Sequence, residues 1–406
     1  MDDDGCDADS DAASTNSDEV DRRALGTASA APGECDRGWF AVADLPTGAS
    51  ERLPVAIANG AADGPTLWLT GGVHGDEATG VAVVQDAVAA FDGDPLADLA
   101  GAVVAVPVVS PAGLRRNARH TYYADEDPNR HFPDADAESA RPPRLQERVD
   151  ARLYAAITGE PADDDSAETD RDDPVEGVAA DALIDCHTAG VGSEPFAIRD
   201  RVLYGDRRSE DEAAELSAEL GRIVDAFGFP TLREYPAAEY VEENLQRSTA
   251  GAVLNEAGVP AFTAELGAHS VVDDGLVDAG VAGIFAVAVE LGLVTPDAVP
   301  AAVGEPADHF DPAPVDFPVR RYRGPTTDVA GLVRHRVAAG DRFDEGEVLA
   351  DVVAATGAER GEVTVDRDGY VLGRTEGLAV YEGDPIGSLA VRDDGDLVVP
   401  RDAADD

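Results

Sequence analysis

Two uninterrupted apolar runs, residues 67–70 and 103–109, most strongly limit what this chain can fold into. Neither run alternates between apolar and polar side chains, so each suits a strand that is buried on both faces. Residues 79–91, between them, have the spacing of an amphipathic helix. A strand, a helix and a second strand at this separation form a βαβ unit, whose crossover is right-handed by default.

The same alternation continues along the chain and predicts an α/β fold, a mixed sheet flanked by helices. Further helices are expected at residues 145–157, 210–227, 250–257 and 278–291, and strands at residues 39–42, 53–57, 182–185 and 262–266.

Composition divides the chain into regions. Residues 1–35 are rich in Asp, Ser and Ala and predict a disordered acidic tail. Residues 36–295 form the predicted α/β domain, with an acidic insert at about 159–177. A proline-rich linker is expected at 296–318, and short strands separated by Gly-Asp turns predict a small barrel-like β domain at 319–400. This punctuation is similar to that of biotinyl and lipoyl carriers, but those attach their cofactor to lysine, and this chain contains none. We therefore expect the β domain to be a lid or wall of the site.

The charge balance is extreme, with 82 acidic against 31 basic residues and a formal net charge of −51. Molar salt screens such self-repulsion to within a few ångströms, so the composition indicates a halophilic protein. It argues against nucleic-acid binding, which needs basic patches. No apolar run is long enough for a membrane span, and the acidic N-terminal segment does not have the pattern of a signal peptide. Three cysteines cannot pair evenly, so we expect a cytoplasmic location, and the oligomeric state stays open.

Residues 71–77, Gly-Gly-Val-His-Gly-Asp-Glu, follow the first buried run directly. His74 and Glu77 can approach one cation from a single turn, and the glycines let the backbone bend sharply beside it. By itself an H-x-x-E pattern is weak, but a second histidine, His187, follows the strand predicted at 182–185. Two histidines, a carboxylate and one position open for water make a catalytic zinc site of the metallo-carboxypeptidase type. Cobalt or manganese are the alternatives for such ligands.

A second polar stretch contains Arg115-Arg116-Asn117-Ala118-Arg119 and, further on, Asp127-Pro128-Asn129-Arg130-His131-Phe132-Pro133. The planar fork of Arg130 can bind a substrate carboxylate, with Asn129 completing the clamp. Asp127 is suited to accept the remaining N–H of a metal-bound histidine. The alternative is a charged loop that makes surface ion pairs, which is the usual fate of such residues.

The ordered set G-G-V-H-G-D-E, D-P-N-R-H-F-P, I-D-C-H and T-A-E-L-G resembles the succinylglutamate desuccinylase/aspartoacylase family of zinc carboxypeptidase-like hydrolases, over about residues 38–400. The resemblance implies one zinc ion per chain, held by His74, Glu77 and His187. It also implies that Glu265 is the general base and acid, and that Asn129 with Arg130 grips the substrate. An arginine upstream of that pair polarises the scissile carbonyl in the family. Arg116 and Arg119 both qualify here, and we favour Arg119.

The expected function is a zinc-dependent amidohydrolase, a deacylase that uses metal-activated water on a small N-acyl amino acid or a related amide. Two alternatives stay open: a zinc metallo-carboxypeptidase acting on peptides, and a non-catalytic relative that binds a ligand. Metal analysis and amine release from a panel of N-acyl amino acids separate the three.

Overall fold

A twelve-stranded mixed sheet runs through the molecule, in the order β14-β17-β19-β12-β10-β8-β11-β7-β5-β6-β4-β3. The computed structural model describes residues 22–123, 126–133, 142–159 and 177–402. Residues 1–21 of the predicted tail and residues 160–176 of the predicted insert lie outside these ranges. The middle of the sheet is parallel, with β5 (Ala62–Gly71) between β6 (Ala100–Val106) and β7 (Ala182–Ala189), and β11 (Ala261–Ala268) next to β7.

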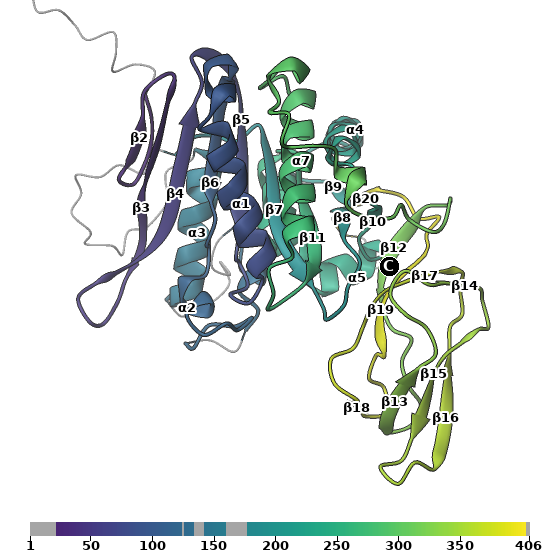
Figure 1. Cartoon of the computed structure of the whole chain (residues 1–406). Coiled ribbons are helices and arrows are strands. Elements are labelled where there is room, and N and C mark those ends of the chain that lie inside the picture. Colours follow the sequence, from purple (N-terminus) through teal and green to yellow (C-terminus); the bar gives the residue numbers. More distant parts are fainter. Residues whose placement is uncertain (1–21, 124–125, 134–141, 160–176, 403–406) are drawn as a thin grey trace, which may run out of the picture.

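Helices cover both faces of this sheet (Figure 1). The predicted βαβ unit is β5-α1-β6, with α1 at Ala78–Phe91 and the two strands parallel. Helix α7 (Asp274–Glu290) packs between α1 and α4 (Glu210–Phe227), whereas α3 (Leu145–Thr158) lies on the other side of the sheet (Figure 1). The predicted α/β class, with a mixed sheet flanked by helices, is confirmed.

Strands near the N-terminus correct one prediction. Residues 23–35 were expected to be disordered, but β1 (Arg23–Leu25), β2 (Ala28–Ala30) and the start of β3 (Glu34–Asp44) are ordered strands. Some of their apolar side chains are almost completely buried, as at Leu25 and Ala28. A three-residue strand shows too little periodicity to be found in an Ala- and Ser-rich sequence.

The C-terminal region has the expected all-β character, and it also extends the main sheet. Strand β12 (Val319–Arg323) pairs in parallel with β10 (Thr231–Arg233) and antiparallel with β19 (Gly387–Arg392). Strands β17 (Gly369–Arg374) and β14 (Arg342–Phe343) continue the sheet beyond β19. A separate four-stranded sheet contains β16 (Glu359–Thr364), β15 (Val348–Val353), β13 (Gly331–His335) and β18 (Ala379–Val380).

The region is tied back to the α/β body a second time, because β20 (Val398–Pro400) pairs with β9 (Val202–Tyr204). The boundaries of the predicted domains stay predictions. The remaining elements are β4 (Ser50–Asn59), β8 (Phe196–Arg199), α2 (Pro111–Leu114), α5 (Ala237–Glu242), α6 (Thr249–Ala252), the π-helical turn η5 (Val253–Ala257), and the 3₁₀ turns η2 (Asp94–Asp98), η3 (Pro128–Arg130), η4 (Leu245–Arg247), η6 (Pro296–Ala298) and η7 (Pro306–Asp308).

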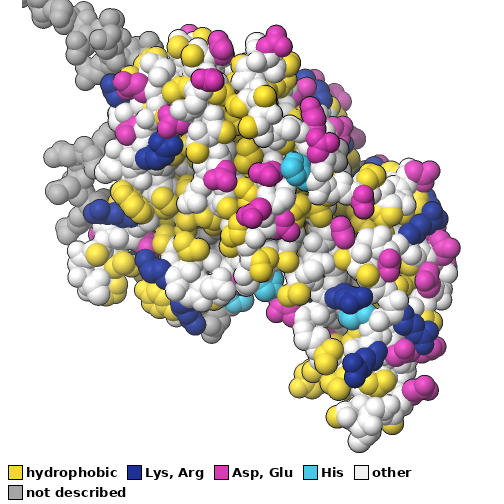
Figure 2. Space-filling view, viewed as in Figure 1, with side chains coloured by type: hydrophobic (Ala, Val, Ile, Leu, Met, Phe, Trp, Pro, Cys, Tyr) yellow, Lys and Arg dark blue, Asp and Glu magenta, His cyan; other side chains and the backbone are white. Residues whose placement is uncertain are grey.

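The surface is dotted with acidic side chains, and it is hollowed where the C-terminal strands meet the α/β body (Figure 2). Histidine side chains are visible on the wall of this hollow (Figure 2). No helix in the described part of the chain combines the length and apolar character needed to cross a membrane.

Candidate metal centre and active site

The turn after β5 carries the first two candidate ligands. Gly72 has φ +58°, a left-handed conformation that disfavours other residues. A Cβ on Gly75 would lie 1.9 Å from the backbone carbon of Gly113, so only glycine permits this close approach. The resulting sharp turn directs His74 and Glu77 inward, where both are buried.

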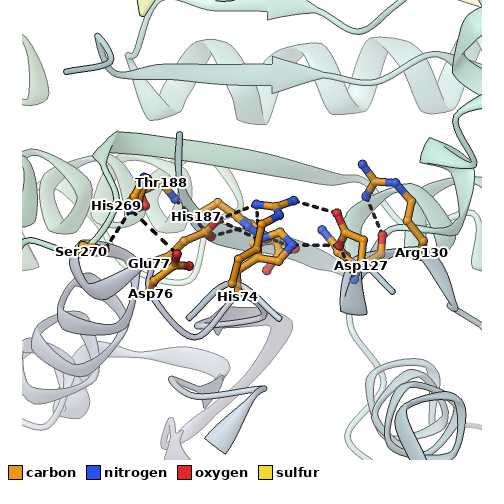
Figure 3. A network of polar contacts seen from close by, with 12 residues as sticks. His74, Asp76, Glu77, Asp127, Arg130, His187, Thr188, His269 and Ser270 are labelled. Atoms are coloured by element: carbon orange, nitrogen blue, oxygen red, sulfur yellow. Dashed lines mark hydrogen bonds and ion pairs between the residues drawn. The ribbon is translucent and has the colours of Figure 1, made fainter. Parts of the chain in front are cut away.

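The third candidate ligand, His187, comes from β7. One ligand atom from each of His74, Glu77 and His187 lies within 4.8 Å of the other two. The Nδ1 atoms of both histidines face Glu77, each 2.7 Å from a different carboxylate oxygen. Figure 3 shows these side chains meeting from two separate strand ends. The three residues predicted from the sequence therefore come together in the structure.

Each histidine forms a hydrogen bond to a second carboxylate through Nε2, the ring nitrogen that does not face Glu77. The Nε2–H of His74 donates to Asp127 at 3.0 Å, in the arrangement expected from the sequence (Figure 3). The Nε2–H of His187 donates to Asp185 at 2.8 Å, and Thr70 Oγ1 donates to the other oxygen of Asp185 at 2.6 Å. Such partners fix the tautomer and the ring orientation of a metal-ligating histidine. The sequence reasoning missed Asp185, although Asp-x-His in a strand places both side chains on one face.

Charge interactions inside this cluster oppose the cost of burial. Burial alone would raise the pKa of Glu77, but the two neighbouring histidines hold it well below its usual range. Burial likewise disfavours protonation of His187, yet Asp185 and Glu77 raise the pKa of its imidazole well above the ordinary value. The site is therefore built for a positive charge between the three side chains, which a divalent cation would supply.

Glu265 lies beside this cluster, on β11, and its backbone pairs with His187. Its side chain is buried, and its Oε2 has no hydrogen-bond partner among the described residues. Burial and the nearby charge of Glu77 raise the pKa of Glu265. A buried carboxylate oxygen without a partner is costly unless a ligand or a solvent molecule completes it. The donor set of two imidazoles and a carboxylate, with this orphan oxygen beside it, fits a catalytic zinc site.

Arg119 reaches the cluster, and Arg116 does not. Arg119 Nη1 lies 3.2 Å from His74 Nδ1 and donates to Glu77 at 3.4 Å, while its Nη2 donates to Asp127 at 2.7 Å. Burial lowers the pKa of this guanidinium, but the charges of Asp127 and Glu77 raise it above the ordinary value. Arg116 is exposed on the same loop. Of the two arginines, only Arg119 is placed to act on a group at the metal position.

The predicted clamp residues lie in the short turn η3, beside Asp127. The side-chain oxygen of Asn129 accepts hydrogen bonds from the backbone and the hydroxyl of Thr249, at 2.7 and 3.0 Å, so this oxygen anchors the loop. Only its amide N–H₂ is left to bind a substrate. Arg130 Nη1 donates to the carbonyl of Asn129 at 2.7 Å. Arg247 Nη2 donates a hydrogen bond to the carbonyl of His131 at 3.3 Å and so connects η4 to this loop.

Comparison with known proteins gives one family match and several structures of similar fold. Residues 63–167 match the succinylglutamate desuccinylase/aspartoacylase catalytic domain. A succinylglutamate desuccinylase/aspartoacylase from Rhodobacter sphaeroides has a similar structure, with a TM-score of 0.65 and 19% identity over 96% of this chain and 99% of that one. No functionally curated protein matches the chain.

Two further solved structures share the fold. An aspartoacylase family protein from Mesorhizobium loti matches with a TM-score of 0.63 and 18% identity, over 90% of this chain and 96% of that one. The product-bound ectoine utilization protein EutE from Ruegeria pomeroyi matches with the same TM-score and identity, over 88% and 95%. The resemblance drawn from the motifs is thus confirmed, by the family match over residues 63–167 and by the shared fold.

Proposed function

We propose that the protein is a zinc-dependent deacylase that hydrolyses the amide bond of a small N-acyl amino acid or a related amide. One observation carries the proposal: the ligand atoms of His74, Glu77 and His187 lie within 4.8 Å of one another, beside the unpartnered oxygen of Glu265. When bound there, zinc supplies a Lewis acid that lowers the pKa of a coordinated water to about 7.

Glu265 has the position and the environment of the general base. The pKa of Glu265 is raised toward neutral pH, and a group whose pKa lies near the working pH both accepts and releases a proton efficiently. Oε2 takes a proton from the attacking water and later delivers it to the leaving amine. Its burial keeps bulk water from competing for that proton.

The arginines act on the substrate. Arg119, already directed at the cluster, would donate to the carbonyl oxygen as negative charge develops on it, a contribution typically of about 3–4 kcal/mol for one donor. The amide N–H₂ of Asn129 and the guanidinium of Arg130 would hold a substrate carboxylate. Fixing the substrate at that end keeps the scissile bond in register with Glu265.

The test is a substrate panel in molar KCl, with metal content measured on the same preparation. Zinc-loaded protein should release amine from at least one N-acyl amino acid. Glu265→Gln should keep the metal and lose the turnover. Trimming of peptides without release of amine from any N-acyl amino acid would replace the deacylase with a carboxypeptidase, and full activity in Glu265→Gln would overturn the role of that residue.

A further inference from the structure

The pairing of four neighbouring strands places several charged residues on the sheet face that carries His187. Strand β11 pairs with β8, β8 with β10, and β10 with β12, with Thr263 opposite Ile198, Ile198 opposite Leu232, and Arg233 opposite Arg320. Paired residues on neighbouring strands point to the same face of the sheet, and successive residues along one strand point to opposite faces. The charged side chains that this alternation assigns to the same face as His187 include those of Glu265 and Arg321, and those of Asp200 and Glu234, which directly follow β8 and β10.

Arg321, on strand β12, is held in place but keeps donors available. Its Nε donates to Glu234 at 3.0 Å, and its guanidinium lies over the ring of Tyr235, 5.0 Å from the centroid. Its side chain is 21% exposed. Neither of its two Nη atoms donates a hydrogen bond to a residue in the described ranges. The Glu234 contact thus fixes the orientation of the fork and leaves its outer edge open to a ligand.

Arg130 is a second positive charge that interacts electrostatically with Arg321. It is half-buried, and its Nη1 donates to a neutral carbonyl, so that hydrogen bond leaves its charge unneutralised. Burial lowers the pKa of Arg130, and the charges of Arg321 and Arg119 lower it further, although Asp127 opposes them. The positive charges of Arg321 and Arg119 thus disfavour the charged form of Arg130, and an anion bound beside these groups would oppose that effect.

The acidic neighbours do not supply that anion. Burial and the charge of Glu234 raise the pKa of Asp200 well above its ordinary value, although Arg321 and Arg130 oppose them. Glu234 also accepts a hydrogen bond from the backbone of Tyr235 at 3.0 Å, which fixes it against Arg321. Asp127 is already engaged by His74 and Arg119.

We propose that Arg321 is a substrate-binding residue that forms an anion subsite together with Arg130. The ligand is a carboxylate of the substrate, on its acyl half or on its amino-acid half. The inference rests on the proposed function and adds to it a role for the C-terminal region: β12 completes the active site, with Glu234 as the residue that positions Arg321. The competing explanation is that Arg321 only neutralises a buried Glu234.

A double variant separates the two explanations. If Arg321 serves only to neutralise Glu234, the double variant Arg321→Met with Glu234→Gln removes both charges. It should then regain the succinate affinity and the KM that Arg321→Met alone has lost. If Arg321 binds the substrate, the double variant stays impaired. Arg323→Met is the matched control, because Arg323 lies on the same strand and is exposed.

Two measurements are needed, one of them independent of turnover. Calorimetric titration of zinc-loaded protein with succinate, a dicarboxylate probe, should show affinity about 10-fold or more lower in Arg321→Met and in the double variant, and unchanged in Arg323→Met. Kinetics on N-acetyl and N-succinyl derivatives of one neutral and one acidic amino acid should show a raised KM in Arg321→Met. The compounds that lose affinity identify the half of the substrate that carries the anion.

Wild-type affinity and KM in the double variant would overturn the inference and leave the deacylase intact. Succinate binding that depends on Arg321, in a protein that hydrolyses no N-acyl compound, would overturn the proposed function and leave the anion subsite standing.

Discussion

The α/β body and the C-terminal strands bury their apolar side chains in cores of different size and construction. In the body, parallel strands are covered by helices on both faces and share one large apolar core that includes Trp68, Phe91 and Phe262. The region after residue 318 is largely antiparallel and has a much smaller core of its own, around Val333, Leu349 and Val391. It projects from the end of the sheet (Figure 1).

This difference determines which region carries the chemistry. Strands β5, β7 and β11 are parallel neighbours, so their carboxyl ends meet and bring ligands and base together. A buried parallel sheet also holds those ends rigidly. The C-terminal region has no comparable set of parallel strand ends among the described residues. Its strand β12 pairs with β10, however, and carries Arg321 on the sheet face of the site. In the proposed mechanism, the body therefore supplies the reactive groups, and the C-terminal strands supply an additional positive charge.

Loss of the metal should have the largest effect. His187→Ala removes one of three ligands, and we expect zinc content and turnover to fall below detection. Cys186→Ala is the matched control, since Cys186 is buried in the apolar core next to His187 and should leave zinc content unchanged. Metal analysis and amine release check both variants. Normal zinc content in His187→Ala would place the metal elsewhere.

Replacing the base should lower turnover without removing the metal. For Glu265→Gln we expect kcat to fall by about 10²–10⁴, the range for a general acid–base group, with zinc content unchanged. Oε2 of Glu265 has no hydrogen-bond partner among the described residues, so an amide at this position breaks no hydrogen bond of Oε2 to them. Steady-state kinetics with metal analysis provide the measurement, and a change in KM alone would contradict the assigned role.

The two candidate arginines of the loop after α2 should differ sharply. Arg119→Met removes a donor directed at the cluster, so kcat should fall by about 10²–10³. Arg116→Met, an exposed neighbour on the same loop, should change kcat less than twofold. Equal losses in the two variants would mean that the loop as a whole, rather than one guanidinium, supports the reaction.

The attachment of the C-terminal region should depend on Arg201. This side chain is only 1% exposed, donates to the carbonyls of Tyr235, Glu234 and Asp396, and forms an ion pair with Asp393. Arg201→Met removes these contacts, including those to the buried residues Glu234 and Asp393, so we expect a loss of about 3–5 kcal/mol in the free energy of unfolding.

Denaturant unfolding in molar KCl measures this loss. The control is Arg222→Met, whose exposed pair with Glu290, at 3.9 Å, should contribute less than about 1 kcal/mol. Equal stability of the two variants would show that strand pairing alone holds the regions together.

The smallest effect concerns pH. The base must be ionised to accept a proton, and burial together with the charge of Glu77 raises the pKa of Glu265. Activity should therefore fall about tenfold per pH unit once the pH drops below the pKa of Glu265. That pKa should lie above the ordinary value for glutamate. A profile of kcat/KM against pH, with zinc content followed in parallel, tests this. An acid limb at or below the ordinary glutamate value would mean that the carboxylate is more solvated than its burial implies.

The sequence by itself determined the local chemistry: the buried βαβ unit, the turn that carries His74 and Glu77, and the second histidine at the end of another strand. These features depend on near neighbours and on side-chain alternation, which a single sequence displays directly. It also pointed to Asp127, because that residue stands inside a recognisable motif.

Only the tertiary structure decided which distant groups meet. Arg119 rather than Arg116 faces the ligands, Asp185 supports His187, and Arg321 lies on the same sheet face as Glu265 although 56 residues separate them in the sequence (321 − 265). Strand order and register, which no local pattern specifies, set those distances.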